Sequence, residues 1–226
     1  MYARLVSYSA PSEDLIEEGI VNLQDIVAYC ARVSNPNNQF NTKTARALIE
    51  YLLKHKHFSP LEMVSACIEI KTTRDIARQI LRHRSFSFQE FSQRYADPTK
   101  DLEFEFREAR MQDPNNRQNS IDTEDESLKI RWEEKQKSII DNSKSVYAWA
   151  IKNGIAKEVA RSVLPEGLMQ SKLYMNGTLR SWLHYIQLRS ENGTQKEHQE
   201  VAVACALQIT KLFPTIWQHG RMEKDR

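Results

Sequence analysis

Two kinds of hydrophobic periodicity occur along this chain, and together they predict strands and helices. Apolar and polar positions alternate in residues 2–8 and 63–72, as in half-buried β-strands. The apolar set of the second segment is Val64, Ala66, Ile68 and Ile70. Residues 168–176 are predicted as a further strand, and the alternating sequence EFEF at 103–106 predicts a short exposed strand.

Apolar residues at helical spacing predict a larger number of helices. Their ranges are 22–33, 45–53, 73–81, 127–152, 155–163, 179–188 and 197–213. Polar residues that cap helices precede several of them: either Asn22 or Asp25 begins the first, Thr42 caps the second and Thr73 the third. Gly177 or Thr178 begins the helix over 179–188.

The order of these elements predicts the fold class. Strands and helices do not alternate as βαβ units, so we expect an α+β fold with mixed strands and several long helices. Residues 111–126 are polar, contain DPNNRQNS and predict a mobile loop. Because no boundary interrupts the chain, we expect a single domain over residues 1–226.

Composition narrows the class of protein. The chain has 226 residues and a net charge of +2, so nothing attracts it globally to nucleic acid or membranes and any basic site must be local. No apolar run approaches a membrane span, and the N-terminus lacks the apolar core of a signal peptide. Three well-separated cysteines, each beside apolar residues, favour a reduced cytoplasmic protein with structural thiols.

Candidate chemistry is concentrated in the segment RHRSFSFQEFSQRY, residues 82–95. Arg82, His83, Arg84 and Arg94 place four potential cations within fourteen residues, and they repel one another unless an anion lies between them. Phosphate suits the guanidinium fork. The six glycines form neither GxGxxG nor a P-loop, so a nucleotide phosphate must be bound by side chains. The alternative is a solvated basic face followed by a strand.

The spacing of this segment also resembles a known signature. Arg82, His83 and Arg84 followed after seven residues by Ser92 resemble the signature of flavin-dependent thymidylate synthases, and Glu90, Arg94 and Tyr95 continue the match. Gln89 replaces the usual asparagine.

Further segments resemble the same family, in chain order. They are Ala31-Arg32-Val33-Ser34; His57, Ser59, Pro60 and Glu62; Ala160-Arg161 with Leu164-Pro165; and Arg180, His184 and Arg189. Thr178 stands where the family has asparagine and Asn176 lies two residues earlier, so both are candidates for a flavin contact.

The resemblance implies a reaction and its participants. It implies reductive methylation of dUMP to dTMP, with methylenetetrahydrofolate as carbon donor and FAD, refilled by NADPH, as hydride source. The residues implied in cofactor binding are Ser34, His57, Ser59, Glu62, Arg82, His83, Arg84, Glu90, Asn176, Thr178, Arg180 and His184. Those implied in dUMP binding are Gln79, Arg82, Glu90, Ser92, Arg94, Arg161 and Arg189.

The resemblance gives Arg189 the catalytic role, because a cation beside uracil N3 and O2 favours the ring anion. The family's active sites form between subunits of a homotetramer, so the partners implied are dUMP, folate and the protein itself, without nucleic acid or membrane. Each cysteine is predicted to be a buried, unreactive thiol, so no covalent bond to the nucleotide is expected.

Three simpler interpretations compete with these assignments. His55 and His57 beside lysines suggest a metal site, but no cysteine or HExxH accompanies them, and a helix C-terminus explains them better. Arg161 suits an exposed helix surface. The 74–95 stretch as a whole suits a nucleic-acid-binding module that uses arginine for phosphates and phenylalanine for stacking, and an assembly protein without a small-molecule site is a further alternative.

Overall fold

The computed structural model describes residues 2–215, and its centre is a four-stranded sheet with the strand order β1-β2-β6-β3. The strands are β1 (Tyr2–Tyr8), β2 (Ser65–Thr73), β6 (Gln170–Thr178) and β3 (Ser87–Glu90), and all neighbours are antiparallel. In the central pair, Ile68 lies opposite Met175 and Ile70 opposite Leu173. These four apolar side chains are fully buried, which explains the alternation in the sequence.

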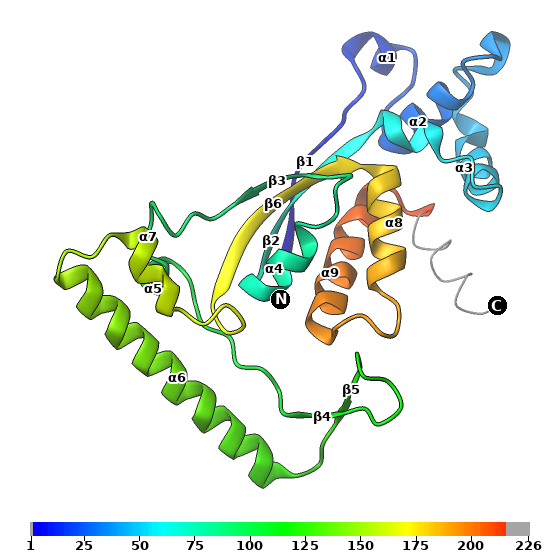
Figure 1. Ribbon diagram of the computed structural model, residues 1–226. Helices are drawn as coiled ribbons and strands as arrows, with labels where there is room; N and C mark the ends of the chain where they lie inside the picture. Colours follow the sequence, from blue (N-terminus) through cyan, green and yellow to red (C-terminus); the bar gives the residue numbers. More distant parts are fainter. Residues whose placement is uncertain (1, 216–226) are drawn as a thin grey trace.

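Helices α4 (Arg74–Ile80), α8 (Leu179–Arg189) and α9 (Lys196–Leu212) pack against the apolar face of this sheet (Figure 1). Trp182 of α8 is fully buried, and its indole N–H donates a 3.0 Å hydrogen bond to the Ala66 carbonyl of β2. Thr178 caps α8, since its hydroxyl accepts from the Ser181 N–H at 3.2 Å. The helices α4 and α8, which carry the candidate residues Gln79, Arg180, His184 and Arg189, therefore pack directly on the sheet.

One end of the sheet carries a helical region that follows β1. It consists of α1 (Glu13–Glu17), α2 (Leu23–Ala31), α3 (Ala45–Lys54) and the 3₁₀ turns η1 (Pro36–Asn38), η2 (Thr42–Thr44) and η3 (Ser59–Met63). Asn22 begins α2, because its side chain accepts from the Asp25 N–H at 3.1 Å. Buried Val27, Ile49 and Leu61 join this region to the main core.

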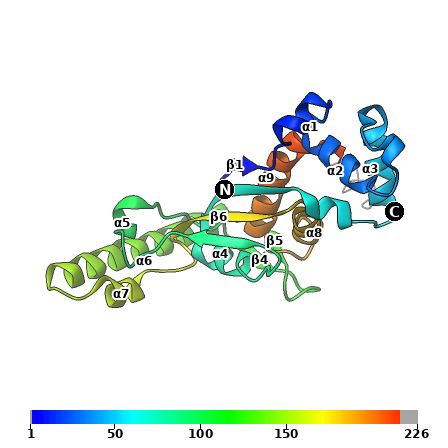
Figure 2. The ribbon, with the colours of Figure 1, turned by 90° about the horizontal axis from the view of Figure 1, so that it is seen from above.

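The opposite end carries the long helix α6 (Glu126–Lys152), with α5 (Pro98–Asp101), α7 (Lys157–Ala160) and the turn η4 (Arg161–Val163) (Figures 1 and 2). Tyr147 and Ala150 of α6 form a small separate core with Ala160, Leu164 and Met169. On other faces of α6, large apolar side chains remain exposed: Ile130, Trp132, Ile139 and Trp149.

The structure confirms the α+β class and most of the expected elements, but it corrects several boundaries. Strand β2 begins at Ser65 instead of residue 63, because Met63 belongs to η3. Strand β6 begins at Gln170 instead of 168, because the Met169 N–H donates to the Pro165 carbonyl in a turn. Thr42 does not cap α3: it begins a 3₁₀ turn, and the helix starts at Ala45.

Three further predictions fail for local reasons. Residues 103–106 form no strand, and only Phe104 makes a β-bridge, to Met169. The predicted helix over 155–163 is divided into α7 and η4. The segment 111–126 is not a structureless loop, because β4 (Arg110–Gln112) and β5 (Ser120–Asp122) form a hairpin. Its turn is held by Asp113, whose carboxylate accepts from the Asn115 N–H at 2.8 Å and the Asn119 side chain at 2.9 Å.

Within residues 2–215, no helix combines the length and the apolar character that crossing a bilayer requires.

Candidate active site

A tight turn at residues 82–86, here called the cationic turn, joins α4 to β3. Within it the His83 N–H donates to the Ile80 carbonyl at 3.0 Å and the Phe86 N–H donates to the His83 carbonyl at 3.2 Å. Arg82 and Arg84 are exposed, and neither has an ion-pair partner within the described residues 2–215. The turn therefore presents two uncompensated cations at the surface, as an anion-binding site would.

The cationic turn is positioned by a close contact with β6. The Phe86 ring is buried and lies against Gly177, where an added Cβ would come within 2.4 Å of Phe86 Cδ1. Only glycine fits beneath the ring at this distance. Ser181 of α8 adds a second attachment, because its hydroxyl donates to the Ser85 carbonyl at 3.1 Å.

Arg189, at the C-terminal end of α8, is joined to this turn. Its Nε–H donates a 3.0 Å hydrogen bond to His83 Nε2. Burial, followed by the charge of Arg189, lowers the pKa of His83, so the ring is neutral at pH 7 and its proton is on Nδ1. The ring also packs edge-on against Tyr185, with centroids 5.0 Å apart. His83 therefore supplies a neutral N–H donor rather than the cation that the sequence suggested.

Gln79 of α4 lies beside this pair, within a chain of half-buried and buried polar groups. Its Oε1 is 3.2 Å from His198 Nδ1, and its Nε2 donates to Gln195 Oε1 at 2.8 Å. The His198 ring is fully buried and lies 6.3 Å from the His83 ring. The structure thus brings together three predicted residues, Gln79, His83 and Arg189, through one that was not predicted, His198.

The chain of polar groups continues to the start of α9. Gln195 Nε2 donates to Glu197 Oε2 at 2.9 Å, and Arg107 and Arg110 both form ion pairs with Glu197. Burial alone would raise the pKa of Glu197, but a backbone hydrogen bond, Arg107, Gln195 and Arg110 together lower it, so the group is a carboxylate. Arg107 also pairs with Asp75 of α4 at 2.8 Å.

A second group of predicted residues lies where η3 meets the start of α8. Glu62 and Arg180 form an ion pair, and the Phe58 ring packs edge-on against His184 at 5.4 Å. The remaining predicted residues around this junction are exposed or half-buried: His57, Ser59, Asn176 and Thr178. Ser34 is exposed in the segment that follows α2.

This group also bears on two alternatives from the sequence. One is whether Asn176 or Thr178 contacts flavin, and the other is whether His55 and His57 bind a metal. The Thr178 oxygen is engaged as the helix cap, whereas Asn176 has an exposed side chain on β6. Tyr51, His55 and His57 form a cluster of rings with centroids 4.3 to 6.2 Å apart. No group of three metal-ligating side chains occurs in residues 2–215.

A third group surrounds α7. Arg94 Nη2 lies 3.5 Å from Glu158 Oε2, and Arg161 Nε donates to the Glu158 carbonyl at 3.3 Å. The Arg94 N–H faces the Ser92 hydroxyl at 3.4 Å. This arrangement brings Ser92, Arg94 and Arg161 together from segments nearly seventy residues apart in the chain.

Glu90 is the last residue of β3, an edge strand of the sheet. Its carboxylate accepts from the Ser171 hydroxyl at 2.7 Å and lies 3.7 Å from the Arg74 guanidinium. The expected residues thus fall into separate groups, and the elements that bear the second and third lie at opposite ends of the sheet (Figures 1 and 2).

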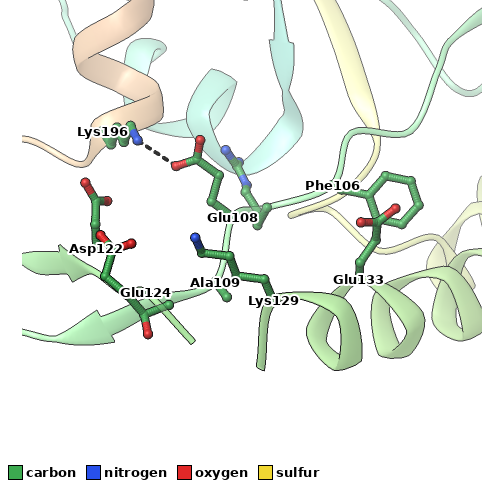
Figure 3. Close-up of a pocket in the computed structure, with 10 residues that line it drawn as sticks. Phe106, Glu108, Ala109, Asp122, Glu124, Lys129, Glu133 and Lys196 are labelled. Atoms are coloured by element: carbon green, nitrogen blue, oxygen red, sulfur yellow. Dashed lines mark hydrogen bonds and ion pairs between the residues drawn. The ribbon is translucent and has the colours of Figure 1, made fainter. Parts of the chain in front are cut away.

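Figure 3 shows a pocket of about 490 Å³ between the 106–109 segment, the hairpin, α6 and the start of α9. Its rim is bridged by Lys196 and Glu108, whose side chains are 2.6 Å apart. None of the predicted site residues lines it. Acidic and basic side chains both line the pocket, and one of them, Arg107, pairs with Glu197 of the polar chain.

His198, Gln195 and Glu197 were missed because they stand in a polar-looking run, QKEHQE. A signal was nevertheless present. His198 lies three, four, seven and eleven residues before Val201, Ala202, Cys205 and Ile209, all of which are buried on one face of α9. A histidine in the apolar stripe of a helix is a buried polar group, and a buried polar group requires a partner.

These observations define the class of protein: an α+β protein in which exposed arginines lie near a hydrogen-bonded set of arginine, neutral histidine and glutamine side chains. Comparison with known proteins identifies the family.

A family model described as thymidylate synthase complementing protein matches residues 15–215. A probable flavin-dependent thymidylate synthase of Paramecium bursaria Chlorella virus 1 is 46% identical over 216 residues, which are 96% of this chain and 97% of the relative. The flavin-dependent thymidylate synthase of a Synechocystis strain has the same identity and coverage. That of a Thermus thermophilus strain is 30% identical over 90% of this chain and 76% of its own. The chain therefore belongs to the flavin-dependent thymidylate synthases, which are enzymes.

Proposed function

We propose that this protein converts dUMP to dTMP by reductive methylation, with methylenetetrahydrofolate as carbon donor and FAD, refilled by NADPH, as hydride source. The observation that carries the proposal is the joined set of Gln79, His83 and Arg189 in a chain of this family. An amide, a neutral imidazole and a guanidinium together offer the donors and the positive charge that a uracil edge requires.

The base of dUMP would lie against Arg189 and Gln79. Arg189 uses Nε for His83, so its two terminal nitrogens are left to donate to a substrate. A fixed guanidinium beside uracil N3 and O2 lowers the pKa of the ring and makes it an anion that is rich in electrons. Arg189 is therefore the catalytic residue of the proposal.

The phosphate of dUMP would lie at the group around α7. Ser92, Arg94 and Arg161 supply a hydroxyl and two guanidinium groups, which match phosphate oxygens. Arg94 is exposed, and its guanidinium lies 3.5 Å from the carboxylate of Glu158, which is also exposed. Such exposed ion pairs are weak, so a phosphate can take the place of the carboxylate.

The residues present also fit FAD. Arg82 and Arg84 offer the uncompensated charge that a pyrophosphate needs in a chain without a glycine-rich loop. The group of His57, Ser59, Glu62, Arg180 and His184 offers further polar contacts, with Asn176 exposed near it. Ser34 after α2 would add a hydroxyl, and Glu90 is an acceptor for a hydroxyl group. Bound flavin would supply the hydride, and these side chains bind and orient it.

The separation of the groups supports shared active sites. Because the groups around η3 and around α7 lie at opposite ends of one chain, a single site that uses both requires another copy. We propose a homotetramer of single-domain chains with the fold of this family, working in the cytoplasm.

The test is the absorption spectrum of freshly purified protein, followed by an assay. We expect flavin bands that bleach with dithionite and return in air, and dTMP formation that requires dUMP, methylenetetrahydrofolate and NADPH together. A colourless protein whose affinity for an oligonucleotide falls steeply with salt would overturn the proposal in favour of nucleic-acid binding.

A further inference from the structure

We propose that Glu197 and His198, adjacent at the start of α9, are positioning residues that fix the orientation of the Gln79 side-chain amide from its two ends. The inference rests on the proposed function, in which the Gln79 amide contacts the uracil base. The four groups Glu197, Gln195, Gln79 and His198 are called the amide relay below.

Glu197 determines which groups of the relay donate hydrogen bonds and which accept them. Its carboxylate is ionised and pairs with Arg107 and Arg110, so it only accepts hydrogen bonds. The Gln195 amide nitrogen, 2.9 Å away, is therefore the donor, and the Gln195 oxygen must point away from Glu197. An amide normally has two possible orientations related by a flip. Here the acceptor at one end permits only one.

The orientation of Gln195 then determines that of Gln79. The Gln195 oxygen accepts at 2.8 Å, so the partner atom of Gln79 must be its nitrogen. The Gln79 oxygen consequently faces His198, whose Nδ1 is 3.2 Å away. An oxygen cannot donate, so the proton of the His198 ring must lie on Nδ1.

The surroundings of His198 favour the same tautomer independently. Its Nε2 is buried and has no hydrogen-bond partner within the described residues 2–215. A buried N–H without a partner is rarer and more costly than a bare acceptor, so the proton belongs on Nδ1, where Gln79 accepts it. Both ends of the relay thus require the same orientation of the Gln79 amide.

The consequence concerns the choice of base. With one hydrogen bond at each end, the Gln79 amide retains one N–H and one lone pair of its oxygen in a fixed order. Uracil and cytosine differ in the order of donors and acceptors on their N3 edge. A fixed amide favours one order, whereas a freely flipping amide accepts both. The amide relay is therefore a device for specificity toward a uracil-type base.

The test compares substitutions at His198 in the flavin-loaded enzyme. His198→Leu removes the donor, whereas His198→Asn places an amide nitrogen near the position of Nδ1. The dissociation constants of dUMP and dCMP are measured by calorimetry. We expect the leucine variant to bind dUMP about 10-fold more weakly, with a smaller preference over dCMP, and the asparagine variant to stay within about 3-fold of the wild type.

Two further variants separate positioning from structure. In a Gln79→Ala background, His198→Leu should cause no additional loss of dUMP affinity, since its effect acts through that amide. Gln195→Met, at a half-buried position, removes the amide that connects Gln79 to Glu197. It should therefore also weaken dUMP binding and the preference for dUMP over dCMP. Gln199→Met is the matched control, because Gln199 lies on the same helix and donates to the Ser190 carbonyl instead.

Each outcome bears on a different claim. Normal dUMP affinity and preference in both His198→Leu and Gln195→Met would overturn the relay, as would an equal loss in the Gln79→Ala background. A wild-type protein that binds neither flavin nor dUMP would overturn the proposed function itself, and the relay as a device for base recognition with it.

Discussion

Arg189 Nε and His83 Nε2, 106 residues apart in the chain, are joined by a 3.0 Å hydrogen bond. The bond has a fixed direction, because a guanidinium only donates and the low pKa of His83 keeps its ring neutral. The last turn of α8 and the cationic turn are therefore one unit, and a change in either residue alters the geometry of the other.

Replacement of Arg189 by lysine should lower the turnover number by about 100-fold or more, although the charge is kept. Lysine has no planar fork, so it cannot donate to His83 and to a uracil edge in the same geometry. Steady-state formation of dTMP measures the effect. Arg78→Lys is the control, because Arg78 is exposed and pairs with Glu166. Near-normal turnover in Arg189→Lys would remove Arg189 from the catalytic role.

The variants His57→Ala and Arg84→Ala should bind FAD more weakly while they remain folded. Both side chains are exposed, so truncation should change the free energy of unfolding by less than about 0.5 kcal/mol. Flavin titration by fluorescence quenching and the melting temperature check the two statements. His55→Ala, two residues from His57 and also exposed, is the control. A variant that binds FAD as the wild type does would show that its side chain does not contact the cofactor.

Replacing Cys30 and Cys67 by serine and Cys205 by alanine should preserve turnover. The prediction that each cysteine is buried holds for Cys205, whereas Cys30 and Cys67 are half-buried. Partial burial still raises the pKa of the Cys30 and Cys67 thiols, and full burial raises that of Cys205, so none is poised as a thiolate nucleophile. The melting temperature should fall modestly, since the Cys205 change costs on the order of 1 kcal/mol. Complete loss of dTMP formation in the folded, flavin-loaded triple variant would establish an essential thiol. If turnover persists, Ser92→Ala tests the remaining hydroxyl.

The active species should be an oligomer. The elements that bear the groups around η3 and α7 lie at opposite ends of the sheet, and α6 exposes Trp132 and Trp149, which a further copy of the chain would cover. Light scattering coupled to size exclusion, followed by assays of each fraction, measures both mass and activity. An active monomer would contradict shared sites.

Acidic conditions should destabilise the protein through His198. Burial, then the charges of Arg189 and His83, lowers the pKa of His198 to about 3, whereas an unfolded histidine has a pKa of about 6.5. Below about pH 6.5 His198 binds a proton in the unfolded chain, whereas in the folded protein it stays neutral until about pH 3. The free energy of unfolding therefore falls as the pH falls, by on the order of 5 kcal/mol from this residue across that range.

Urea unfolding of the wild type and His198→Asn between about pH 7.5 and 4.5 tests this dependence. The variant lacks the titrating ring, so its stability should decline less steeply with falling pH. The neighbouring groups that titrate or carry charge, His83, Tyr185 and Arg189, are present in both proteins. Parallel curves would show that His198 does not carry this pH dependence.

The sequence predicted what local patterns determine. Alternation located β1 and β2 within two residues at either end, and helical spacing located α6 and α8 within one. The hairpin over 110–122 was not predicted, because its turn depends on hydrogen bonds of the Asp113 side chain and its strands show no apolar alternation. A polar segment without periodicity gives no local sign of such a turn.

For the site, the resemblance supplied Gln79, His83 and Arg189, but nothing in the sequence joined them. Their connection runs through His198, and the pairing of residue 79 with residues 195 and 198 exists only after the sheet has brought α4 and α9 together. Contacts between residues so far apart in the chain cannot be predicted from local sequence patterns. The same limit applies to the separation of the predicted residues into distant groups.

Phe86 and Gly177 are ninety-one residues apart in the chain, but the Phe86 ring occupies the space that a side chain at position 177 would need. Alanine at 177 would push the ring aside and displace the cationic turn, while a smaller residue at 86 alone would leave a void. Each change is harmful singly and compatible with the other, so the two positions are expected to covary in evolution. A screen for second-site suppressors of Gly177→Ala should accordingly recover smaller side chains at position 86, and recover flavin binding with them.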